Sequence, residues 1–190
     1  GSRDFREGRD TADYYSGRLI RKVFMEEKRY ALLIDADNIS KKYIKCMLNE
    51  ISKYGIVTYK RIYGDWTKND NSSWKAVLLE NSITPIQQYS YTTGKNATDS
   101  AMIIDAMDIL YTGQVDGFCL ASSDSDFTKL ASRLRESGMT VIGMGENKTP
   151  KAFRVACDRF TSLEILLDPD AAEKEASATS NKGTKTKGNK

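Results

Sequence analysis

The chain has no histidine among its 190 residues. Histidine is the most frequent general acid or base in enzymes and the commonest metal ligand. Its absence excludes histidine-based catalytic triads and histidine-ligated metal sites. Any hydrolytic chemistry must therefore rely on carboxylate, lysine or hydroxyl side chains.

Cysteines and long apolar runs are also scarce. Cys46, Cys119 and Cys157 are widely separated and form no C-x-x-C pair, which argues against a structural zinc site or a disulfide framework. No apolar run approaches the ~18 residues needed to cross a membrane, and no signal peptide is recognisable. These features predict a cytoplasmic protein with no membrane partner and no disulfide partner.

Excess charge of one sign is lacking in the central part of the chain. The formal net charge of +3 depends on residues 182–190, which carry four lysines and no acid. Residues 31–170 contain 16 basic and 18 acidic side chains. A nucleic-acid groove would therefore have to be a local basic patch, because the domain as a whole has no strong positive field.

Composition divides the chain into three parts. Residues 1–29 are predicted to be a charged arm that begins with Gly1-Ser2, a pair typical of a tag-cleavage scar, and Met25 is a candidate natural start. Residues 30–168 are predicted to form one domain. Residues 169–190 are rich in Ala, Ser, Thr, Lys and Gly, and are predicted to be a disordered tail.

The domain alternates strand and helix patterns, which predicts an α/β fold with a parallel sheet. The fully apolar segment 117–121 is typical of a strand buried on both faces, whereas Pro85 predicts an edge strand for 83–89. The expected strands are 30–35, 56–63, 83–89, 117–121, 139–144 and 162–167. The expected helices are 40–54 with Ser40 as N-cap, 72–81, 99–111, 126–137 and 150–157.

Acidic residues follow two of the apolar strands directly. Asp35 and Asp37 follow the first strand, and Asp124 and Asp126 follow segment 117–121. In open α/β sheets, ligands bind at the carboxyl ends of the strands, so these acids should share one crevice. Crowded carboxylates repel one another unless a cation lies between them. The sequence therefore predicts a Mg²⁺ or Mn²⁺ site.

The predicted helix 99–111 carries further acids. At ~100° per residue, Asp99 lies on the same stripe as the apolar residues Met102 and Ala106, so its carboxylate should face the core. Asp108 lies opposite and should be solvated. Asp105 lies on the flank, where it could be a structural hydrogen-bond acceptor or a group that supports the metal site.

Several of these polar residues also have purely structural interpretations. Asp37 and Asn38 could form a turn or cap the next helix. Asp126 could be an N-cap, and Ser122 and Ser123 could be turn residues.

Three segments resemble the motifs of NYN domains, which are LabA-like members of the PIN-like nuclease superfamily. They are Leu33–Asn38, Lys95–Asp99 and Ala121–Phe127, in the family's order, within a match that covers about residues 30–167. The resemblance implies a three-layer α/β/α fold with a mainly parallel central sheet, and metal-dependent cleavage of RNA.

The resemblance also implies roles for individual residues. Asp35, Asp99, Asp124 and Asp126 would hold the metal and form the catalytic set with Asn38, and Asp37 and Asp105 would be secondary acids. Lys95, Ser122 and Ser123 would contact the substrate, which we expect to be single-stranded RNA. A solvated loop lysine is the alternative for Lys95.

Two other functions remain open at this point. Asp35-Ala36-Asp37 is similar to the start of haloacid-dehalogenase-type phosphatases, although Asn38 interrupts their pattern. A catalytically silent RNA-binding scaffold is the second alternative, and homo-oligomerisation is also left open. Trp66 and Tyr91, in predicted loops, could stack on bases, and Trp66 could equally pack in the core.

Overall fold

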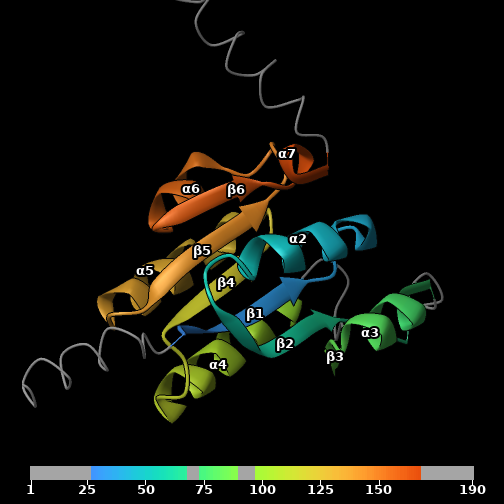
Figure 1. Cartoon of the computed structure of the whole chain (residues 1–190), viewed down its shortest axis with the longest axis horizontal. Helices are drawn as coiled ribbons and strands as arrows, with labels where there is room; N and C mark the ends of the chain where they lie inside the picture. The colour runs from blue at the N-terminus through green and yellow to red at the C-terminus, as the bar shows by residue number, and fades with distance from the viewer. Residues whose placement is uncertain (1–26, 68–72, 90–96, 168–190) are drawn as a thin grey trace, which may run out of the picture.

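The protein forms a six-stranded sheet in which every neighbouring pair of strands is parallel (Figure 1). The structure is a computed structural model that describes residues 27–67, 73–89 and 97–167, with the side chains of 97–99 excepted. The strand order is β3-β2-β1-β4-β5-β6. The strands are β1 (Arg29–Asp35), β2 (Ile56–Gly64), β3 (Thr84–Gln87), β4 (Gly117–Ala121), β5 (Thr140–Gly145) and β6 (Arg159–Ser162).

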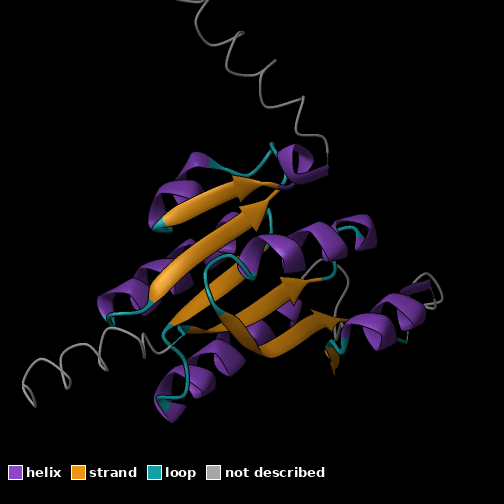
Figure 2. Ribbon diagram, viewed as in Figure 1, coloured by secondary structure: helices purple, strands orange, loops and turns teal. Residues whose placement is uncertain are grey.

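Helices cover both faces of the sheet, which gives three layers (Figure 2). One face packs against α2 (Ile44–Ile51), α3 (Lys75–Asn81) and α7 (Leu163–Leu167). The other packs against α4 (Ala97–Thr112), α5 (Thr128–Glu136) and α6 (Lys151–Ala156). Two short 3₁₀ helices, η1 (Lys41–Tyr43) and η3 (Ser125–Phe127), precede α2 and α5. The predicted α/β fold is confirmed.

The alternation of side chains along β1 determines where Asp35 points. Leu32 and Ile34 pack in the core on the α2 side, whereas Ala31 and Leu33 pack on the α4 side. Successive side chains of a strand point to opposite faces. Asp35 therefore follows Ala31 and Leu33 to the face that α4 and α5 cover, at the carboxyl end of the strand.

The predicted edge strand is confirmed. β3 lies at one end of the sheet and is only four residues long, with Pro85 as its second residue. An edge strand tolerates proline because no strand lies on its open side. The N–H that proline lacks is therefore not needed for a hydrogen bond there.

The prediction of a last strand over 162–167 is wrong. β6 ends at Ser162, and the apolar run from Leu163 to Leu167 forms the short helix α7. Short apolar runs do not distinguish strand from helix by periodicity. Here Glu164 accepts hydrogen bonds from Ser162 Oγ (2.8 Å) and Asn147 N (3.0 Å), which stabilise the turn into the helix.

Ser40 is the N-cap as predicted, with a difference in its contacts. The helical segment begins as the 3₁₀ turn η1, and the Ser40 side chain makes no capping hydrogen bond. The predicted helix 40–54 is too long at its end, because α2 ends at Ile51. At Gly55, which follows, a Cβ would lie 2.1 Å from the carbonyl oxygen of Lys28. Glycine allows that close approach.

In the part of the chain that the structure describes, there is no helix of the length and apolarity that a membrane span requires.

Candidate functional site

Asp35 is the centre of the predicted site, and its carboxylate is held from several sides. The residue is 0% exposed. Its Oδ2 accepts hydrogen bonds from Asn38 Nδ2 and from Ser122 Oγ, each at 2.7 Å. Its Oδ1 accepts from the backbone N–H of Asp37 at 3.1 Å. Asn38 therefore holds the Asp35 carboxylate in place, and it also forms the turn after β1.

Among the described residues, the two oxygens of the Asp35 carboxylate differ in their number of donors. Each carboxylate oxygen has about two lone-pair positions. Both positions of Oδ2 are taken, whereas Oδ1 accepts from one donor in the part of the chain that the structure describes. Among the described residues Asp35 forms no ion pair. Burial raises the pKa of Asp35 above its ordinary value, and the hydrogen bonds from Ser122, Asn38 and Asp37 offset part of that rise. A cation at Oδ1 would stabilise the ionised form.

Ser122 connects Asp35 with the second group of acids. β4 pairs with β1, and Ser122 follows its last residue. The Ser122 hydroxyl donates to Asp35 and accepts from the backbone N–H of Asp124 at 3.0 Å. Because one hydroxyl touches both segments, the structure brings Asp35 and the start of the Asp124 turn together.

The other predicted residues near this turn differ in burial and in their hydrogen-bond partners. Asp124 is half-buried and caps η3, because its Oδ1 accepts from the N–H of Asp126 at 2.9 Å. The capping role considered for Asp126 thus belongs to Asp124. Asp126 and Asp37 are both exposed. The buried Ser123 hydroxyl accepts from the N–H of Glu146 at 2.9 Å, which joins the end of β4 to the end of β5.

Helix α4 is oriented as the sequence predicts. Met102 and Ala106 are fully buried and Asp108 is exposed. Asp99 lies in the first turn of α4, but its side chain is outside the described residues, as are Lys95 and Tyr91.

Asp105 has a structural partner in β2. Its carboxylate forms an ion pair with Arg61 Nη1 and accepts a hydrogen bond from the hydroxyl of Tyr63. Burial and the neighbouring Asp105 carboxylate raise the pKa of Tyr63, so the phenol stays protonated and donates. Of the two interpretations of Asp105, the structural acceptor has direct support from these contacts.

Asp65 is a buried acid beside the predicted site that was not expected from the sequence. It follows β2, the neighbour of β1, and is 7% exposed. Its Oδ1 accepts from Thr67 Oγ1 (2.5 Å), Thr67 N (3.2 Å) and Gln87 Nε2 (3.0 Å). The signal was present in the sequence, since Asp65 follows a strand as Asp35 does. Its contacts show that it organises the loop after β2.

Two roles were considered for Trp66, stacking on bases and packing in the core, and its contacts are those of core packing. Its indole N–H donates to the carbonyl of Ile86 at 2.9 Å, and its ring packs edge-on against Trp74 with 6.2 Å between centroids. These contacts hold the ring against the α2–α3 side of the core.

The donors at this edge fit a hard divalent cation. Oxygen ligands are those that Mg²⁺ and Mn²⁺ prefer. Asp35 is the last residue of β1, and Asp124 lies in the turn that follows the adjacent strand β4. The described residues contain no group of three acids close enough to hold a metal. The third predicted ligand is Asp99, whose side chain is not described.

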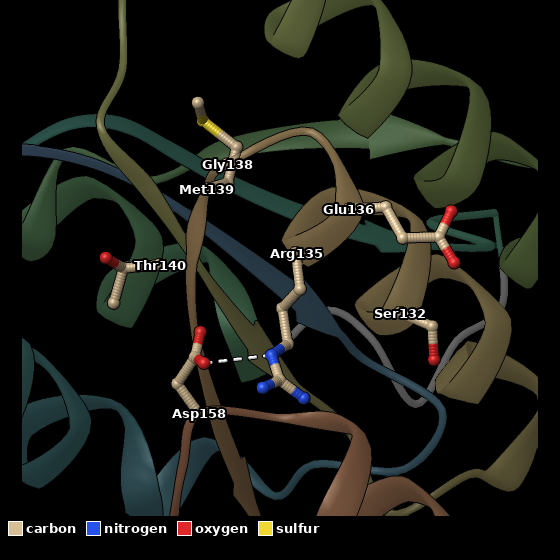
Figure 3. Close-up of a pocket in the computed structure, with 7 residues that line it drawn as sticks. All are labelled: Ser132, Arg135, Glu136, Gly138, Met139, Thr140 and Asp158. Atoms are coloured by element: carbon tan, nitrogen blue, oxygen red, sulfur yellow. Dashed lines mark ion pairs between the residues drawn. The ribbon is translucent and has the colours of Figure 1, made fainter.

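A separate pocket of about 530 Å³ lies on the side of the sheet where β5 begins, away from the carboxyl ends of β1 and β4 (Figure 3). It adjoins the amino end of β5 and the carboxyl end of α5, and Arg135 Nε pairs with Asp158 across it at 2.8 Å. None of the predicted site residues lines it. Its lining residues are Ser132, Arg135, Glu136, Gly138, Met139, Thr140 and Asp158.

A protein of known structure shares this fold. The chain is similar to the crystal structure of a protein of unknown function, VPA0982, from Vibrio parahaemolyticus, with a TM-score of 0.61 and 16% sequence identity. The similarity covers 73% of this chain and 94% of that one. At this level of identity, the comparison supports the fold and not the activity.

A curated relative is similar in sequence. The uncharacterized protein MJ0482 of Methanocaldococcus jannaschii is 27% identical over 156 residues, which cover 78% of this chain and 62% of that protein. The chain therefore spans about three fifths of the length of this relative. The NYN domain family model matches residues 29–164, which include β1, β4 and the residues at their carboxyl ends. The chain belongs to the NYN domain family.

Proposed function

We propose that this protein is a metal-dependent ribonuclease that hydrolyses phosphodiester bonds of single-stranded RNA at the carboxyl edge of β1 and β4. The observation that carries the proposal is the Asp35 carboxylate, which is fully buried, is oriented by three hydrogen bonds and, among the described residues, has a single donor at Oδ1. Membership of the NYN family supports it, because the family is grouped with nucleases.

The electrostatics of Asp35 favour a cation over a purely structural role. A buried ionised carboxylate is costly unless it is paired, and no described cation pairs with this one. The local hydrogen bonds reduce the cost without removing it, since the pKa of Asp35 remains raised. A divalent ion would compensate the charge directly.

We assign the roles as follows. Asp35, Asp99 and Asp124 would hold the ion with Asp126, and Asn38 and Ser122 would keep the Asp35 carboxylate in place. The bound ion would activate a water molecule and offset the charge that develops on the phosphate. Asp37 is the exposed acid next to this set and a secondary contributor.

Contacts to the substrate would come from other groups. The hydroxyls of Ser122 and Ser123 already bond to protein partners, so they shape the site from within. Lys95 is the proposed phosphate contact, because basic side chains are the usual partners of phosphate oxygens.

The test is cleavage of labelled single-stranded RNA with Mn²⁺ or Mg²⁺, with and without EDTA. We expect cleavage by the unmodified protein that EDTA abolishes. Asp124→Asn should lose cleavage and keep RNA binding, because the acids do not contribute attraction for phosphate. Asp108→Asn is the matched control, since Asp108 is an exposed acid of α4.

Persistent cleavage by Asp124→Asn would disprove the placement of the site. One rival is a catalytically silent RNA-binding NYN domain. RNA binding without cleavage over a range of metals and RNAs would establish that rival. The phosphatase alternative is disfavoured by the sequence, because Asn38 interrupts the pattern that those enzymes need after Asp35 and Asp37.

A further inference from the structure

A loop at the carboxyl edge of the sheet is held in a fixed shape. It spans residues 146–149, between β5 and α6, and its Thr149 is 4% exposed. Arg154 of α6 donates to the carbonyl oxygens of Asn147 (2.6 Å) and Thr149 (3.0 Å). The N–H of Asn147 donates in turn to Glu164 of α7 at 3.0 Å. Because hydrogen bonds tie its backbone to two helices, the loop presents its exposed side chain from a defined position.

The same loop is joined to the candidate site. The N–H of Glu146 donates to the Ser123 hydroxyl at 2.9 Å, and Ser122, the preceding residue, donates to Asp35 at 2.7 Å. Lys148 extends from this loop, and its side chain is 67% exposed. Its ammonium group pairs with Glu146 at 2.9 Å. An exposed pair of this kind contributes little stability, so Lys148 remains available to another anion.

Three more lysines lie on η1 and α2, at the same edge of the sheet. Lys41, Lys42 and Lys45 are exposed, and η1 follows the turn at the end of β1. η1 contacts α7, the helix that carries Glu164. Figure 1 shows α7 beside the carboxyl ends of β5 and β6. The lysines that follow β1 and the loop that follows β5 therefore approach each other at α7.

Electrostatic contacts confirm that these two segments are neighbours. Burial raises the pKa of Glu164, but hydrogen bonds and the nearby charge of Lys42 lower it below its ordinary value. The pKa of Lys148 is raised by its bond to Glu146 and, more weakly, by the charge of Glu164. Lys42 and Lys148 thus lie on either side of one carboxylate. We refer to Lys41, Lys42, Lys45 and Lys148 as the lysine cluster.

The lysine cluster is a local positive patch. Residues 31–170 contain 16 basic and 18 acidic side chains, so the domain as a whole has no positive field. Among the described residues, Lys41, Lys42 and Lys45 form no ion pair. The ammonium group of Lys42 lies 4.7 Å from the centroid of the Tyr43 ring. Clustered basic side chains on one face are the electrostatic footprint of a nucleic-acid site.

We propose that the lysine cluster binds the phosphates of single-stranded RNA and holds the strand beside Asp35, on the side of the site that faces β5 and α7. This inference rests on the proposed function, since it takes RNA as the substrate. Phosphate contacts fix the register and orientation of a strand without reading its sequence. The fixed loop gives Lys148 a defined position relative to Asp35, whereas the lysines of η1 and α2 extend the contact along the strand.

The experiment measures the binding of a short labelled oligouridine by fluorescence anisotropy in EDTA, so that metal-dependent cleavage does not consume the RNA. The unmodified protein, Lys148→Gln and the double variant Lys42→Gln/Lys148→Gln are each titrated between about 50 and 200 mM salt. Arg133→Gln is the matched control, because Arg133 is an exposed cation in the last turn of α5, away from the lysine cluster. Mn²⁺-dependent cleavage is measured separately on the same proteins.

The salt dependence of binding counts the phosphate contacts. On a single strand, loss of one contact lowers the slope of log affinity against log salt by about 0.7. We expect a decrease of about 0.7 for Lys148→Gln and about 1.4 for the double variant, and no change for Arg133→Gln. Binding of oligoadenosine should weaken as binding of oligouridine does, because phosphate contacts carry no sequence information.

Acetylation of the unmodified protein gives a second measure that needs no variant. Bound RNA should protect Lys42 and Lys148 from acetylation. Lys53 should stay reactive, since it lies just beyond the other end of α2 and its side chain is 66% exposed. Polyglutamate at the same charge concentration should protect less than RNA. Equal protection by polyglutamate would assign the lysine cluster to acidic partners in general and overturn the inference.

Two further results would overturn the inference while leaving the proposed function intact. In the first, the unmodified protein cleaves RNA with Mn²⁺, and both cluster variants keep its salt slope. In the second, Arg133→Gln lowers the slope as much as Lys148→Gln does, and only the net charge then matters. RNA binding with the expected slopes but no cleavage with any metal would refute the proposed function and keep the lysine cluster as an RNA-binding surface. An unmodified protein that does not bind single-stranded RNA would refute both.

Discussion

The substitution Asp35→Asn separates a metal-binding carboxylate from a structural one, because it removes the charge and keeps the shape. An asparagine whose carbonyl oxygen replaces Oδ2 would retain the 2.7 Å hydrogen bonds from Asn38 and Ser122. Its amide nitrogen would replace Oδ1 and face the N–H of Asp37, so the 3.1 Å bond would be lost. One lost hydrogen bond with an unpaired donor costs about 1–3 kcal/mol.

The removal of the charge acts in the opposite direction. Burial raises the pKa of Asp35 above its ordinary value of 3.8, so the ionised carboxylate destabilises the folded protein. Each unit of such a rise corresponds to about 1.4 kcal/mol of unfolding free energy. The two effects oppose each other, and we expect Asp35→Asn to differ from the unmodified protein by no more than about 1–2 kcal/mol at neutral pH without metal.

The balance should depend on pH in a defined direction. Below the unfolded pKa, Asp35 is protonated in both states and carries no charge penalty. As the pH rises through the raised folded pKa, the unmodified protein loses the stability that its protonated form provided. The stability of Asp35→Asn relative to the unmodified protein should therefore increase between about pH 4 and about pH 8.

Urea unfolding in EDTA at these two pH values measures the effect, with Asp108→Asn as an exposed control expected to stay within about 0.5 kcal/mol. A second series at an Mn²⁺ concentration 100 times the dissociation constant should stabilise the unmodified protein by about 2.7 kcal/mol, and Asp35→Asn by much less. A loss above about 3 kcal/mol for Asp35→Asn in EDTA, equal at both pH values, would refute this reasoning and make Asp35 a structural group.

Two further predictions concern the core around the site. Gly145→Ala should lower the unfolding free energy by about 1–3 kcal/mol, because its Cβ would lie 2.5 Å from both the carbonyl oxygen of Ser122 and Thr149 Oγ1; urea unfolding measures this, and an unchanged midpoint would contradict it. Burial raises the pKa of Cys157 to about 12 and also raises that of Cys119, and since the thiolate is the reactive form, neither should react with a disulfide reagent at pH 8 before unfolding. Rapid labelling of two or more thiols in the folded protein would disprove the second prediction.

Several elements were predictable because a local signal was sufficient. The apolar run 117–121 predicted a buried strand with the observed bounds, and Pro85 predicted the edge position of β3. The exposed position of Asp108 followed from helical periodicity alone. The run 163–167 was predicted wrongly, because apolar residues in sequence satisfy either a strand or a short helix until their neighbours are known.

The candidate site was also predictable only in part. Polar residues after β1 and β4 were expected to meet, because the carboxyl ends of parallel strands lie at one edge, and the hydroxyl of Ser122 does join Asp35 to the Asp124 turn. Oδ2 of Asp35 accepts from Asn38, 3 residues away, and from Ser122, 87 residues away. No local pattern encodes the contact with Ser122.

The sequence by itself determined the chemistry available to this protein: without histidine, and with acids placed after apolar strands, only carboxylates can organise a metal site. It also determined the α/β class, since strand and helix patterns are local properties of the chain. The tertiary structure alone decided the partners of Asp105, because Arg61 and Tyr63 are 44 and 42 residues away in sequence. It likewise decided that Asp65 is buried and that Trp66 packs in the core, since both depend on which strands become neighbours and how far each loop extends.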